Sequence, residues 1–83
     1  MEDLTLVIPA KNESESLPTV LSNLNNFNCK KIIVIDPLDN ETFEVTKNFN
    51  CKTVMQKNKG YGNALIEGIN SVQTSFLCIF NAD

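Results

Sequence analysis

Three short segments place carboxylates directly after apolar runs of this 83-residue chain, where a ligand could reach them. They are Pro9–Glu13, Asp36–Asp39 and Asn81–Asp83. Such carboxylates suit Mg²⁺ or Mn²⁺, which bridge a diphosphate with one or two carboxylates and with waters. A carboxylate after the fourth apolar run, such as Asp83, therefore fits a divalent cation that binds a phosphorylated ligand.

Glycine-rich loops that hold phosphates with backbone N–H groups are absent from the sequence. A dinucleotide site would need G-x-G-x-x-G after the first strand, but residues 8–13 contain no glycine, and no G-x-x-x-x-G-K-[ST] motif occurs. The segment Gly60-Tyr61-Gly62 follows the third apolar run and lacks the third glycine. Phosphate groups would therefore need a metal ion or basic side chains.

The elements that must position these segments alternate between strand and helix patterns. Short apolar runs at residues 4–8, 32–35 and 76–80 are typical of buried strands, and residues 52–55 are expected to form a third, shorter strand. Apolar residues at helical spacing predict helices at 17–24, about 41–49 and about 61–72. A βαβαβαβ order predicts an α/β, Rossmann-like parallel sheet with right-handed crossovers, formed by residues 1–83 as one unit.

The strand order decides where a ligand would bind. If the winding begins in the middle of the sheet, the order is 3-2-1-4, and a crevice opens at the carboxyl ends of the first and fourth strands. The three carboxylate segments then face one site. Within the helices we expect Phe43, Val45 and Phe49 to be buried, and Gly68 to pack closely against the sheet.

Composition excludes several classes of function. The net charge is −3 and no basic stripe occurs, so we expect no nucleic-acid partner. Cys29, Cys51 and Cys78 form no Cys-x-x-Cys pair, and the chain has no histidine to complete a zinc site. We expect reduced, structural cysteines packed as small hydrophobes, a cytoplasmic location, and membrane association only through regions outside these residues.

Four segments, in order along almost the whole chain, resemble motifs of the family-2 glycosyltransferases. Leu6–Glu13 resembles their V-I-P-A-Y-N-E strand and loop, and Ile33–Asp36 with Asp39–Thr42 resembles their second strand and D-D-G-S-T-D-G-T loop. Asn58–Leu65, with a glycine three residues further on, looks like their N-x-G-x-G-x-A-L-x-x-G helix. Phe80–Asp83 is similar to their D-x-D segment. The family includes dolichol-phosphate-mannose-synthase-like and bacterial polysaccharide enzymes.

This resemblance implies the N-terminal portion of a GT-A fold and transfer of a sugar from a UDP- or GDP-sugar to an acceptor, as in polysaccharide biosynthesis. The implied nucleotide-sugar-binding residues are Pro9, Ala10, Lys11, Glu13, Asp36, Asp39 and Lys59. Asp83 would coordinate Mg²⁺ or Mn²⁺ on the diphosphate. No catalytic residue is implied within these residues, because the family's carboxylate base lies further along the chain. We therefore expect the 83 residues alone to be inactive.

Three positions depart from the family pattern. Lys11 replaces the usual aromatic residue, so an ammonium group stands where a ring would stack on the base. Pro37 replaces the second acid of the usual pair, and Asp39 is the nearest carboxylate that could take its role. Asn81 replaces the first acid of D-x-D, which leaves Asp83 as the metal ligand of that segment.

Other interpretations remain open from the residues alone. Asp36 and Asp39 also suit helix caps, and Glu13 suits the first turn of a helix, where it would favour the dipole. A sugar nucleotidyltransferase would carry G-x-G-x-R after the first strand, which this chain lacks. A third possibility is a non-catalytic module that forms a homodimer through the open, apolar edge of the 76–80 strand.

Overall fold

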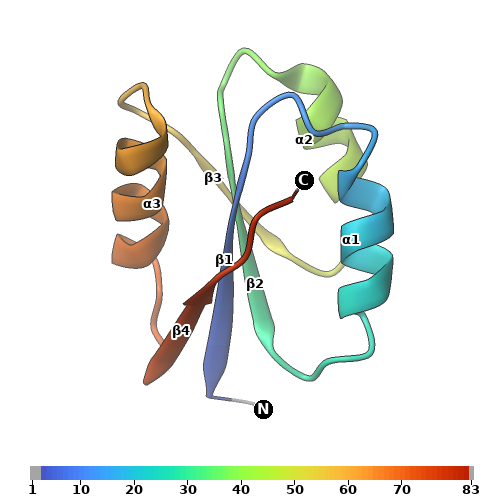
Figure 1. Ribbon diagram of the computed structural model, residues 1–83, viewed down its shortest axis with the longest axis vertical. Coiled ribbons are helices and arrows are strands. Elements are labelled where there is room, and N and C mark those ends of the chain that lie inside the picture. The colour runs from blue at the N-terminus through green and yellow to red at the C-terminus, as the bar shows by residue number, and fades with distance from the viewer. Residues whose placement is uncertain (1–2, 83) are drawn as a thin grey trace.

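Apolar, β-branched runs form a four-stranded parallel sheet in the computed structural model, which describes residues 3–82 (Figure 1). The strands are β1 (Leu4–Ala10), β2 (Lys30–Ile35), β3 (Lys52–Met55) and β4 (Phe76–Ile79). Their order is β3-β2-β1-β4 and every neighbouring pair is parallel, as the alternating pattern predicted. This α/β topology is Rossmann-like and agrees with the N-terminal portion of a GT-A fold that the resemblance implied.

Three helices cover the two faces of the sheet. The helices α1 (Leu17–Leu24) and α2 (Asn40–Thr46) lie on one face, and α3 (Tyr61–Asn70) lies on the other (Figure 1). Two helices end earlier than the pattern predicted. The N–H groups of Asn48 and Phe49 after α2, and of Val72 after α3, bond carbonyls three residues back, so these residues form tighter turns.

Alternate residues of the two central strands supply two cores. From β1, Leu6 and Ile8 pack against α1, whereas Val7 faces α3, and all three are almost fully buried. From β2, Ile33 joins the first core and Val34 the second. Burial on both faces explains why these strands are continuously apolar rather than alternating with polar residues.

The buried side of α2 differs from the prediction. Thr42 and Thr46 are almost fully buried, whereas the expected Phe43, Val45 and Phe49 are half-buried at the edge of the first core. The Thr46 hydroxyl donates to the Phe43 carbonyl at 2.6 Å, and the Thr42 hydroxyl to a carboxylate oxygen at 2.7 Å. Because their hydroxyls are satisfied, these small side chains can face the protein interior.

Gly68 lies where α3 crosses the two central strands, as predicted. A Cβ atom at this position would stand 2.5 Å from Val7 Cγ1 and 2.8 Å from Val34 Cγ2. Carbon atoms normally approach no closer than about 3.5 Å. Glycine therefore allows α3 to pack closely on the second face of the sheet.

The outer strand β4 leaves apolar side chains uncovered. Phe76, Leu77 and Phe80 are all exposed, and within the described residues β4 pairs only with β1. Cys78, expected to be a packed small hydrophobe, is also exposed, because it belongs to this edge strand; Cys29 is half-buried against the first core. No helix in residues 3–82 is long and apolar enough to cross a membrane.

Candidate functional site

A proline in the central strand determines where the sheet opens. Pro9 was expected to end the first strand, but it lies within β1 and is in register with Val34 of β2. On the other side, the pairing of β1 with β4 ends at Val7↔Ile79, followed by a bond from the Phe80 N–H to the Val7 carbonyl. The next bond of a parallel ladder would need a backbone N–H at Pro9, which proline lacks.

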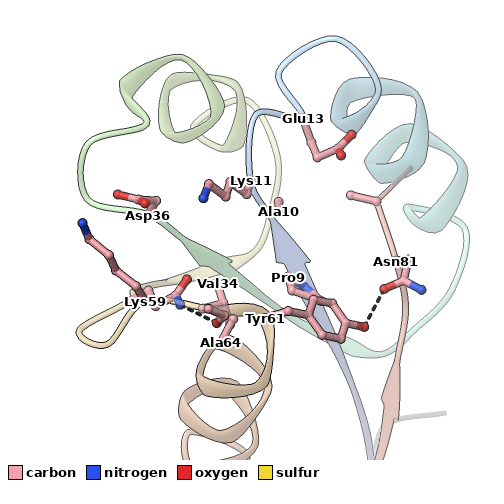
Figure 2. A pocket seen from close by; sticks show the side chains of 13 residues that line it. Pro9, Ala10, Lys11, Glu13, Val34, Asp36, Lys59, Tyr61, Ala64 and Asn81 are labelled. Carbon is pink, nitrogen blue, oxygen red and sulfur yellow. Dashed lines mark hydrogen bonds between the residues drawn. The ribbon is translucent and has the colours of Figure 1, made fainter.

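Beyond that point a cavity of about 410 Å³ opens at the carboxyl ends of the strands (Figure 2). Its wall is formed by the ends of β1 and β2, the segment after β4, and the beginning of α3. The residues that line it are Pro9, Ala10, Lys11, Glu13, Val34, Asp36, Gln56, Lys59, Gly60, Tyr61, Ala64, Asn81 and Ala82. This is the switch point of the sheet, where open parallel sheets bind ligands.

Six of the seven residues implied to bind a nucleotide sugar therefore line one cavity: Pro9, Ala10, Lys11, Glu13, Asp36 and Lys59. In the view of Figure 2, Lys11, Lys59 and Asp36 lie on one side and Glu13 on the other. Lys11 and Lys59 form no ion pair with another residue of the described range. Asp39 does not line this cavity, and Asp83 lies outside the described residues.

Asp39 instead joins two loops through its carboxylate. One oxygen accepts the Asn12 N–H at 2.7 Å and the Thr42 hydroxyl at 2.7 Å, and the other accepts the Thr42 N–H at 3.3 Å. Asn12 has φ 56°, a left-handed conformation in which asparagine is tolerated. Burial opposes ionisation of Asp39, but these hydrogen bonds outweigh it and lower the pKa of its carboxyl group. The helix-cap interpretation of Asp39 is confirmed.

Glu13 is held at the cavity wall by its neighbours. Its carboxylate accepts a hydrogen bond from the Ser16 hydroxyl at 2.5 Å, and its N–H donates to the Thr42 hydroxyl at 3.3 Å. Its carbonyl accepts the Leu17 N–H at 2.8 Å as α1 begins. The loop between β1 and α1 is thereby fixed at both ends, so the carboxylate is positioned before any ligand binds.

Asp36 ends β2 in a tight turn. One carboxylate oxygen accepts the Leu38 N–H at 2.9 Å, and the Asp36 carbonyl accepts the Asp39 N–H at 2.9 Å. Such a turn is typical of aspartate after a strand. It directs the chain away from the sheet toward α2 and leaves Asp36 on the cavity wall, opposite the beginning of α3.

The loop that carries Lys59 is organised by carboxylate and amide side chains. Glu67 accepts the N–H groups of Lys57 at 2.7 Å and of Asn58 at 2.9 Å, and these bonds lower the pKa of its carboxyl group. Gln56 Nε2 donates to the carbonyls of Asn58 at 2.6 Å and of Gly60 at 2.8 Å. The loop therefore holds Lys59 at the rim by specific bonds.

The structure adds Tyr61, which the sequence analysis did not assign to the site, and joins it to Asn81, which was expected to face the crevice. The Tyr61 hydroxyl donates to Asn81 Oδ1 at 3.0 Å, which links the start of α3 to the segment after β4 across the cavity (Figure 2). Tyr61 follows Gly60, whose φ of 104° only glycine adopts readily. The signal for Tyr61 was its place directly after a glycine in the loop that follows the third strand.

The cavity therefore combines ammonium groups, carboxylates and a small apolar floor. Lysines can bind phosphate oxygens as point charges, and carboxylates can accept hydrogen bonds from hydroxyl or amide groups. Among residues 3–82, no three histidine, cysteine or acidic side chains gather closely enough to hold a metal ion. The described side chains alone thus suit an anionic, hydroxyl-bearing ligand but do not complete a cation site.

Comparison with known proteins agrees with this geometry. The model of the family described as glycosyl transferase family 2 matches residues 5–83. An uncharacterized glycosyltransferase of Mycobacterium bovis and two of Mycobacterium tuberculosis strains are each 29% identical to this chain over 80 residues, covering 96% of it. The chain spans 36% of the length of each of these relatives. Since the family model covers nearly the whole chain, the protein belongs to glycosyl transferase family 2.

Proposed function

We propose that the cavity at the carboxyl ends of the strands binds the nucleotide diphosphate portion of a sugar donor for glycosyl transfer. The observation that carries this proposal is the meeting of Lys11, Lys59, Glu13 and Asp36 in one cavity at the switch point. The volume of about 410 Å³ lies within the range of small-molecule sites, roughly 300–1,000 Å³. Family membership supports the same reaction class.

Each group has a distinct role in this proposal. The ammonium groups of Lys11 and Lys59 attract the diphosphate, which has no glycine-rich loop to hold it here. Asp36 accepts a hydrogen bond from the base or the ribose, and Pro9 and Ala10 form the wall beneath it. Glu13 is already held by Ser16, so it presents a fixed carboxylate to the hydroxyl groups of the ligand.

Asp83 is proposed as the protein's ligand for Mg²⁺ or Mn²⁺, on the resemblance of Phe80–Asp83 to the D-x-D segment. In this proposal the cation neutralises charge on the diphosphate leaving group. Asn81, held by Tyr61, occupies the place of the first acid. One carboxylate together with diphosphate oxygens and waters is a normal arrangement for Mg²⁺.

Calorimetric titration of the chain with UDP and with GDP, each with and without Mn²⁺, tests the proposal. We expect saturable binding of one nucleotide, weakened about three- to tenfold by Lys11→Gln or by Asp36→Asn, since each removes one charged partner. Lys57→Gln is the matched control, because it removes the same charge from a residue outside the cavity wall. Equal binding by all variants, or no binding of either nucleotide, would refute the site.

A second titration isolates the cation. Asp83→Asn is expected to remove the gain in affinity that Mn²⁺ produces and to leave metal-free binding unchanged. A gain that survives in this variant would exclude Asp83 as the ligand. We further propose that residues 1–83 alone bind donor without transferring sugar, since they span 36% of the length of the matched relatives. Sugar transfer by these residues in isolation would contradict this.

A further inference from the structure

A second cavity, of about 610 Å³, lies at the opposite end of the sheet, where the strands begin (lower end of the sheet in Figure 1). Its wall includes the first residues of β2 and β3 and the turn after α3. The lining residues that matter here are Lys30, Lys31, Lys52, Asn50, Ser71 and Gln73. None of them belongs to the proposed donor site.

The charge of this cavity has a single sign. Three of the chain's seven basic residues line it, and within residues 3–82 no acidic residue does, although the chain as a whole carries −3. Lys30, Lys31 and Lys52 form no ion pair within the described range. Asp3, at the same end of the sheet, is not part of the wall, and its carboxylate accepts the Ser75 N–H at 3.0 Å. The cavity is therefore a local positive site on an acidic protein.

Strand register places Lys30 and Lys52 on one face of the sheet. Lys52 is in register with Ile32, and Lys30 lies two residues before Ile32 on β2, hence on the same face. A strand spacing of about 4.8 Å and an offset of two residues separate their Cα atoms by about 8 Å. Two long, flexible lysine side chains at this separation can reach the same phosphate group.

Lys31 adds a buried charge. Only 8% of it is exposed, and its Nζ donates to the Cys29 carbonyl at a long 3.4 Å. Burial raises the pKa of the Cys51 thiol, and the Lys31 ammonium opposes that rise. The positive charge of Lys31 therefore acts on Cys51, a residue of the cavity wall. A bound anion would interact favourably with this positive charge.

We propose that this basic cavity binds a phosphate-bearing anion through Lys30 and Lys52, with Lys31 supplying a buried positive charge behind them. Asn50, Ser71 and Gln73 provide the polar groups that complete such a site. The same chemistry occurs in a free phosphate or pyrophosphate and in the headgroup of an anionic lipid. Because the cavity lies at the opposite end of the sheet from the donor site, the proposal is independent of the proposed function.

The test follows backbone amide signals of the full chain by NMR during titration with inorganic pyrophosphate. We expect saturable shifts at residues 30–32, 50–52 and 71–73. Lys30→Gln and Lys52→Gln should each weaken this binding about three- to fivefold, and the double variant about tenfold or more. Lys57→Gln is the matched control at the other end of the sheet and should change it by less than about twofold. A parallel arm measures sedimentation with phosphatidylcholine vesicles, with and without phosphatidylglycerol.

Each outcome either supports or overturns the proposed anion site. Saturable shifts that the double variant loses support a site for a free phosphate. Sedimentation only with phosphatidylglycerol, also lost in the double variant, supports a lipid headgroup. Shifts confined to residues 9–13 and 57–61 without vesicle binding, or an equal loss in Lys57→Gln, would overturn the proposal. Lys30 and Lys52 are exposed, so the double variant should fold, which its own amide spectrum verifies.

Discussion

Replacing Gly68 with alanine tests the packing of α3 on the sheet most directly. In an open helix interior this change stabilises by roughly 0.8–1.0 kcal/mol, because glycine loses more backbone entropy on folding. Here the new Cβ would stand 2.5 Å from Val7 Cγ1 and 2.8 Å from Val34 Cγ2. Val7 and Val34 are 0% and 1% exposed, so neither methyl group can move aside into solvent.

The two effects oppose each other, and packing should prevail. Overpacking of a core costs typically about 1–3 kcal/mol, and two contacts this short place Gly68→Ala toward the upper end. After subtraction of the helix gain, we expect a net loss of about 2 kcal/mol, which lowers the melting temperature of a domain of this size by about 10 °C. Urea unfolding followed by circular dichroism measures the loss.

Two companion variants make this result specific. Gly62→Ala, in the same helix, meets no atom within 4 Å and should be neutral or stabilise by up to about 1 kcal/mol. Combining Gly68→Ala with Val34→Ala removes one of the two clashes. The loss of unfolding free energy in the double variant should therefore be smaller than the sum of the two single losses by more than about 0.5 kcal/mol. A Gly68→Ala protein as stable as the parent would refute the close approach of α3.

Three further predictions follow from hydrogen bonds and exposed surface. The pKa values of Asp3, Asp39 and Glu67 are lowered in the folded protein, so the unfolded chain binds more protons in acid. The free energy of unfolding should therefore fall as the pH drops below about 5. Urea unfolding at several pH values should show a weaker pH dependence for Glu67→Gln than for the parent. A pH-independent midpoint between pH 6 and pH 3 would contradict this. Tyr61→Phe removes the bond to Asn81 and should cost about 0.5 kcal/mol and speed amide hydrogen exchange at residues 80–82; unchanged exchange would argue against the link. The uncharged edge of β4 should make the 83-residue chain self-associate, which light scattering measures. Phe76→Lys should abolish self-association without loss of the fold. A parent chain that is monomeric at high concentration would disprove the prediction.

Element types and strand order could be predicted because the local patterns are strong. Apart from Thr5 and Lys31 near the strand starts, the buried positions of β1 and β2 are apolar on both faces, which is typical of central parallel strands. Alternation with helical periodicity then allows few topologies. Helix ends were less accurate, because the turns after α2 and α3 depend on single backbone bonds that leave no mark in the residue pattern.

Burial within α2 could not be predicted from hydrophobicity. Thr42 and Thr46 face the interior because their hydroxyls find acceptors in Asp39 and in the helix backbone, and such partners are known only once the chain is folded. Cys78 is the opposite case, a residue of an apolar run that is exposed. Its apolar surroundings in sequence suggested burial, but the position of β4 at the edge of the described sheet leaves it exposed.

For the candidate site, the sequence by itself determined which segments carry the carboxylates. It also determined that these segments follow strands and so lie together at the carboxyl end of the sheet. Only the tertiary structure separated their roles. Asp36 lines the cavity, whereas the carboxylate of Asp39, three residues further on, accepts hydrogen bonds from Asn12 and Thr42. It also located the opening itself, because the missing N–H of Pro9 matters only once β4 lies beside β1 and the ladder between them has to end.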